Sequence, residues 1–226
     1  MFNDGRFAGL IPPDIVLVSS DETVFYVHGT VLLGSSFYRA IADLYSAPLA
    51  DSTMSLTLYS CPIPQDSNKV WVKVKDITAD ELNIVLHALY DLSCANFQPS
   101  FDTIAHAIDK MASLLGLTVN AVIRPGKELY NYIFTLTPLQ PLRIYALAAH
   151  HGIHDLAVNA SAHLLSYPIE AIPDEETVRM GAIYLRKLCV LQTGRKERLV
   201  ELLIPPPCSH PSVPTCGFHE QKAVKA

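Results

Sequence analysis

The residues best suited to metal or acid–base chemistry cluster in the second half of the chain: His150, His151, His154, Asp155 and His163. Residues four apart share a face of an unbroken helix, so His150 and His154 could bind one metal ion together. Gly152 lies between them and is expected to end that helix. We therefore predict a polar corner of a helical hairpin without stoichiometric zinc. A small metal-dependent enzyme built on His150 and His154 is the alternative.

A second group of metal-ligand types lies near the C-terminus: Cys208, His210, Cys216 and His219. Cys-x-x-His is a plausible ligand pair for zinc. However, the Cys-x-His pair is cramped, and the short spacer between the two pairs contains two prolines, whereas zinc fingers have a longer intervening loop. We therefore predict that residues 205–226 form a solvated proline-rich tail, with zinc binding by these four residues as the alternative.

His28 could serve as a catalytic base, but no serine or cysteine nucleophile pattern accompanies it. We interpret it as a histidine between a strand and a helix whose ring forms a local hydrogen bond. The sequence also contains no phosphate-binding glycine loop and no nucleophile elbow. The prediction is a protein that is not an enzyme and that uses no cofactor.

The composition restricts the class of protein further. Half of the 226 residues are hydrophobic and 17% are charged, which favours a packed core over disorder. The net charge of -5 argues against nucleic-acid binding, and no apolar run reaches the length of a membrane span. The five cysteines are scattered and odd in number, which favours a reduced compartment. We expect a cytoplasmic or nuclear protein that binds neither nucleic acid nor membrane.

Strands are predicted at the start of the chain. The segment 14–20 contains the short unbroken apolar run 15–18, and 24–27 follows after a turn, so the two should form a hairpin. Residues 28–45 have the spacing of one or two short helices. The segment 47–69 is rich in Ser, Pro and Asp and should be a long loop, with a short strand at 54–59. Residues 71–75 alternate as in a half-buried strand.

Helices are predicted from Thr78 onward. Thr78 and Glu81 form a capping box, which opens a helix with an apolar face. Further helices are expected over 101–115, over 127–135, from Pro141 to Gly152, over 156–164, from Asp174 to Gly194 and over 195–204. Strands first and helices behind them give an α+β fold, a small sheet followed by an all-helical extension.

Several separated segments together resemble a BTB/POZ domain. They are Asp14-Ile15-Val16-Leu17-Val18, then Phe25-Tyr26-Val27-His28-Gly29-Thr30-Val31-Leu32, then Ser35-Ser36-Phe37-Tyr38. The strand 71–77, the helix 81–90 and the helix ending at 115–117 continue the resemblance in the same order. Residues 142–165 resemble the helical pair that follows this domain in many such proteins, and the layout is similar to stand-alone fungal members. The resemblance implies a BTB/POZ domain over 14–135 and a helical extension over 136–204.

The resemblance implies a protein–protein interaction module that forms homodimers or higher oligomers. Members of the family bind cullin scaffolds of ubiquitin ligases or transcription co-regulators. Their dimers form through the first strand and the first two helices. The implied interface residues here are Asp14, Val16, Val31, Leu32, Phe37, Tyr38 and Ile41.

Two positions depart from the family pattern. Many members carry Lys or Arg directly after the histidine, where it can pair with the aspartate of the first strand, but this chain has Gly29. If Asp14 is buried, it therefore needs another partner or backbone amides. Cullin-binding members often carry an apolar-x-Glu motif before the third strand, yet no glutamate lies between Glu22 and Glu81. A homo-oligomerising adaptor is thus the leading hypothesis, and a cullin substrate adaptor is the alternative.

Overall fold

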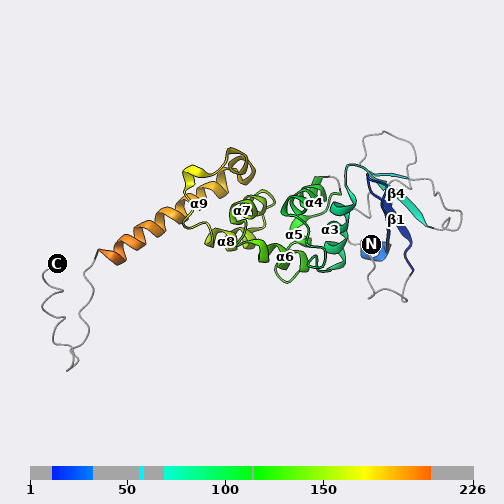
Figure 1. The fold of residues 1–226 in the computed structure, drawn as a ribbon, viewed down its shortest axis with the longest axis horizontal. Helices are drawn as coiled ribbons and strands as arrows, with labels where there is room; N and C mark the ends of the chain where they lie inside the picture. The colour runs from blue at the N-terminus through cyan, green and yellow to red at the C-terminus, as the bar shows by residue number, and fades with distance from the viewer. Residues whose placement is uncertain (1–11, 33–55, 59–68, 114, 205–226) are drawn as a thin grey trace, which may run out of the picture.

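The computed structural model describes residues 12–32, 56–58, 69–113 and 115–204, and their elements form an α+β fold (Figure 1). A small sheet is built from the first part of the chain, and helices follow to residue 203. In Figure 1 the sheet lies at one end of the molecule, α3 to α6 lie between it and α7, and α9 lies at the other end. The predicted α+β class with a helical extension is confirmed.

The sheet has four strands in the order β2-β1-β4-β3. β1 (Ile15–Val18) pairs antiparallel with β2 (Val24–Val27), which confirms the predicted hairpin. β1 also pairs in parallel with β4 (Val70–Val74), and β4 pairs antiparallel with β3 (Leu56–Leu58). β3 confirms the short strand expected within 47–69, and the parallel pairing brings two strands that are distant in sequence together.

The two faces of the sheet have different surroundings because side chains alternate along a strand. Ile15 and Leu17 of β1 point into the main core, together with residues of β2, β4, α3 and α4. Val16 and Val18 point the other way and form a separate cluster with Trp71 of β4. We call the second side the outer sheet face. By register it comprises Val16, Val18, Val24, Tyr26, Trp71 and Lys73.

The predicted capping box is present at the start of α3 (Ala79–Tyr90). The Glu81 amide donates to the Thr78 hydroxyl, and the Thr78 amide donates to Glu81 Oε2 at 2.8 Å. Lys110 Nζ of α4 also donates to that carboxylate oxygen at 2.6 Å. Burial disfavours the charge on Glu81, but these donors outweigh it and hold its pKa below the ordinary value.

The remaining helices agree with most of the predicted segments. They are α1 (Gly29–Leu32), α4 (Phe101–Ser113), α5 (Val119–Val122), α6 (Glu128–Leu136), α7 (Pro141–His150), α8 (His154–Ala162), the 3-10 turn η2 (Ile169–Ala171) and α9 (Asp174–Leu203). Pro141 is the first residue of α7. A backbone amide at this position has no acceptor within the helix, so proline loses no hydrogen bond there. Gly152 follows α7 with a φ of 69°, so the predicted helix stop is confirmed.

The predicted end of a helix at Gly194 is wrong. α9 continues through Gly194 to Leu203, so no break lies where the two predicted helices were expected to meet. Its interruption lies at Gly181 instead, where φ is 71° and ψ is 163°. A glycine inside a helix costs only about 1 kcal/mol relative to alanine, so Gly194 alone does not break a helix with good formers on both sides.

One cluster of buried residues runs from the sheet through α3 and α4 to α7, α8 and the first half of α9. The predicted N-terminal domain and helical extension therefore share an interior. Beyond Gln192 every residue of α9 except Gly194 is exposed, and the helix points away from the rest of the molecule (Figure 1). Within the described residues, no helix combines the length and the apolar character needed to cross a membrane.

Candidate functional site

Asp14 connects the start of β1 to the start of α1. Its Oδ1 accepts a hydrogen bond from the Gly29 amide at 2.6 Å. A Cβ atom at Gly29 would lie only 2.8 Å from Asp14 Oδ2, so the glycine permits this close approach. Asp14 is exposed rather than buried. The Asp14 carboxylate therefore binds a backbone amide, one of the two alternatives considered from the sequence.

The other predicted interface residues lie in different environments. Val16 has no exposed surface in the single chain and belongs to the outer sheet face, whereas Leu32 is fully buried in the main core. Val31 on α1 is half-buried. Phe37, Tyr38 and Ile41 lie outside the described residues. The structure thus places Val16 on the outer sheet face, Leu32 in the main core and Asp14 beside the start of α1.

The outer sheet face also contains residues that the sequence analysis did not select. Val24 and Tyr26 of β2 are cross-strand neighbours of Val18 and Val16, and each is 38% exposed. Lys69 Nζ lies 4.6 Å from the centre of the Tyr26 ring, a cation–π contact. The signal was available in the sequence, because alternate residues of 24–27 point to opposite faces and two apolar side chains must then face away from the core.

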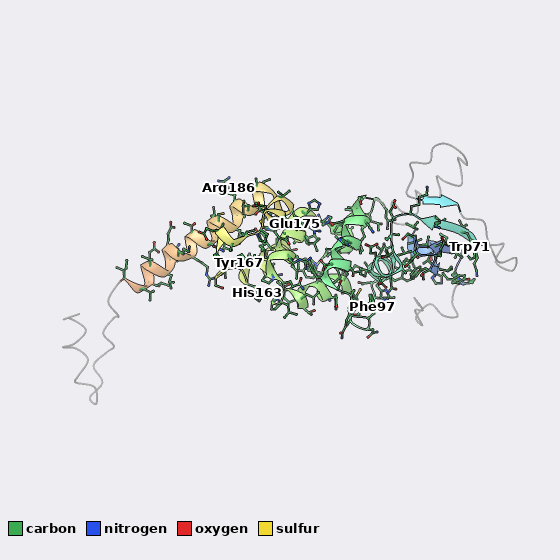
Figure 2. The ribbon with its side chains drawn as sticks, turned by 45° about the horizontal axis from the view of Figure 1, so that its top comes forward. Trp71, Phe97, His163, Tyr167, Glu175 and Arg186 are labelled. Carbon is green, nitrogen blue, oxygen red and sulfur yellow. The ribbon has the colours of Figure 1, made fainter. Side chains whose placement is uncertain are left out.

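Charged residues border this face. Lys73 of β4 forms an ion pair with Glu22 in the turn between β1 and β2. Trp71 lies at the sheet end of the molecule, far from Arg186 on α9 (Figure 2). The exposed apolar part of this face is therefore Val24 and Tyr26, with charged side chains beside it.

His28 has the local role predicted for it. Its amide donates to the Tyr90 hydroxyl at 2.8 Å, and its Nδ1 lies 2.9 Å from the same oxygen. This contact fixes the segment between β2 and α1 on the last turn of α3.

His150 and His154 do not share a helix face. α7 ends at His150 and α8 begins at His154, on either side of Gly152, so the predicted break is confirmed. The structure instead places His150 and His151 beside Asp109 of α4. His151 Nε2 lies 2.7 Å from Asp109 Oδ1. Because Asp109 is 42 positions away in the sequence, helical spacing could not have indicated it.

Arg179 of α9 completes this cluster. Its guanidinium donates to Asp109 Oδ2 at 2.8 Å and to Oδ1 at 3.1 Å. Burial disfavours the charged carboxylate, but the hydrogen bond from His151 and the charge of Arg179 outweigh it, so the pKa of Asp109 lies below its ordinary value. The Asp109 carboxylate therefore connects α4 to both α7 and α9.

A second set of ion pairs joins the same three helices. Arg143 of α7 bonds to Asp102 of α4, and its Nε lies 3.7 Å from Glu176 Oε1 of α9. Burial raises the pKa of Glu176 more than the positive charge of Arg143 lowers it. Hydrogen bonds and charges thus hold the helical extension on α4 at two places.

The four ligand types near the C-terminus, Cys208, His210, Cys216 and His219, lie outside the described residues. Cys94 is buried, and burial raises the pKa of its thiol to about 11, which makes it a poor nucleophile.

In comparisons with known proteins, no family model and no curated protein matches this chain.

Proposed function

We propose that this chain is a protein interaction module of the BTB type that associates with a second copy of itself through the β1–β2 side of the sheet. The single observation that carries the proposal is the exposed apolar pair Val24 and Tyr26 on the outer sheet face, each 38% exposed. The pair lies beside Val16, Val18 and Trp71, which are already buried within the single chain. A tyrosine at the margin of an apolar patch is a typical interface residue.

The order of elements supports the same interpretation. The hairpin β1–β2, the short helix α1, the strand β4 and the capped helix α3 follow one another as the resemblance to BTB/POZ domains implies. The hydrogen bond between Asp14 and Gly29 fixes the start of β1 relative to α1. The proposed interface therefore lies on β1 and β2, whose positions are fixed by strand pairing and by the contact between Asp14 and α1.

A charge placed on the outer sheet face tests this proposal. Tyr26→Glu should shift the chain from dimer to monomer in light scattering coupled to size-exclusion chromatography, because the dimer would then have to desolvate a carboxylate in place of an aromatic ring. Phe134→Glu is the matched control, since Phe134 is an exposed aromatic residue on α6, away from the sheet. An unchanged mass for Tyr26→Glu, or an equal loss with Phe134→Glu, would reject this interface.

A second candidate is a substrate adaptor of a cullin-type ubiquitin ligase. The helical pair α7–α8 directly after the sheet domain favours it, since the resemblance associates such a pair with these proteins. A pull-down with a purified cullin scaffold tests it. Saturable binding at micromolar concentrations would support the adaptor function, and no retention on the scaffold would remove it.

A further inference from the structure

We propose that Asp109, His150 and His151 form a binding site for a transition-metal ion of the zinc type at the junction of α4 and α7. Each residue offers one ligand atom, and the three atoms lie within 4.8 Å of one another. This inference is independent of the proposed self-association. It departs from the sequence-based prediction of no stoichiometric zinc at this corner, and from the pair His150 and His154, because the carboxylate comes from another helix.

The backbone explains why two adjacent histidines can reach the same point. His150 is the last residue of α7, and His151 follows with a φ of -91° and a ψ of 1°, outside the helix. Their rings lie edge to face with centroids 4.8 Å apart. The half-buried Asp109 and His151 are held in place, whereas the exposed His150 can adjust its ring.

Two imidazoles and one carboxylate suit zinc and cobalt(II), which bind such ligands at about 2.0–2.2 Å. Ligand atoms of a tetrahedral site then lie about 3.4 Å apart. The 2.7 Å between His151 Nε2 and Asp109 Oδ1 would therefore lengthen slightly as the ion replaces their hydrogen bond. The imidazole of His151 would bind the ion through the Nε2 lone pair, with its proton on Nδ1.

Arg179 is the main opposing feature, because its positive charge lies against the same carboxylate. Its shorter contact is to Oδ2, at 2.8 Å, whereas His151 contacts Oδ1. The metal would use Oδ1, and Arg179 would keep Oδ2 and orient the carboxylate. Repulsion between the ion and the Arg179 guanidinium limits the affinity for the metal. Arg179→Gln removes this repulsion and should therefore tighten metal binding several-fold.

The experiment is a titration of the metal-free full-length chain with Zn²⁺ by calorimetry and with Co²⁺ by visible absorption. We expect one saturable site, weakened about tenfold or more by His150→Asn or Asp109→Asn. His150→Asn leaves the bonds among Asp109, His151 and Arg179 in place, so its unfolding temperature without metal should equal that of the wild type. His163→Asn is the matched control and should bind as the wild type does.

Zinc binding by the four potential ligands near the C-terminus, Cys208, His210, Cys216 and His219, is tested separately. The titration is repeated with Cys208→Ser and Cys216→Ser in the full chain, and the proposal requires that the site persists with unchanged affinity. Loss of uptake in this double variant would place the ion in the tail and overturn the proposal. It is equally overturned if the wild type shows no saturable binding, or if His150→Asn and Asp109→Asn bind as tightly as His163→Asn.

Discussion

Asp14 Oδ1 and the Gly29 amide form a hydrogen bond of 2.6 Å across 15 positions of the chain. An exposed carboxylate at the start of β1 thereby satisfies the first amide of α1. The glycine allows it, because a Cβ atom at that position would meet Asp14 Oδ2. The aspartate and the glycine therefore depend on each other.

Substitutions at these two positions should not be additive. Asp14→Ala removes the hydrogen bond, and Gly29→Ala displaces the carboxylate, so each should lower the unfolding free energy by about 1 kcal/mol. The double variant should lose less than the sum of the two, because both changes break one interaction. Urea unfolding of the four chains measures this coupling. Strict additivity would show that the contact contributes nothing.

The capping box at α3 should contribute more than an exposed ion pair. Glu81→Ala removes the bonds to the Thr78 amide and to Lys110, and we expect a loss of about 2 kcal/mol. Glu22→Ala breaks the exposed pair with Lys73 and should cost less than about 0.5 kcal/mol. Chemical denaturation of both variants provides the comparison, and equal losses would contradict the assigned role of Glu81.

Asp109 should make stability depend on acid pH. Its pKa in the folded chain is below the ordinary value of 3.8, so its contribution is complete above that pH and is lost as the pH falls through the folded value. Asp109→Asn should cost about 1 kcal/mol at pH 7, a modest figure because the side chain is partly solvated. The deficit should shrink toward pH 2, and a deficit independent of pH would contradict this prediction.

The two glycines of α9 should respond oppositely to alanine. Gly194 lies within the helix, and a Cβ atom added there would meet no other atom within 4 Å, so Gly194→Ala should raise the unfolding free energy by about 0.5–1 kcal/mol. Gly181 has a φ of 71°, which alanine adopts poorly, so Gly181→Ala should lower it by about 1 kcal/mol. Thermal unfolding of both variants tests the assignment, and a stabilising Gly181→Ala would contradict it.

Local patterns in the sequence predicted local structure well. The β-branched run at 15–18, the capping box at Thr78 and the glycine at 152 each specify a short segment, and each prediction is confirmed. Gly194 misled the prediction because its neighbours favour a helix strongly enough to tolerate a glycine.

Contacts between distant residues could not be predicted in this way. Asp109 meets His151 and Arg179 across 42 and 70 positions, and only the packing of α4 against α7 and α9 brings them together. The outer sheet face required the pairing of β1 with both β2 and β4, of which the sequence indicated the first alone. Phe37, Tyr38 and Ile41 remain a prediction from the resemblance.

The self-association of the chain is the central claim, and its mass in solution tests it most directly. Light scattering during size-exclusion chromatography of the wild-type chain, at several loading concentrations, should give twice the chain mass of 24.9 kDa. Phe37→Asp, at a position that the resemblance assigns to the interface, should return the single-chain mass. A wild-type mass of one chain at every concentration would contradict the account.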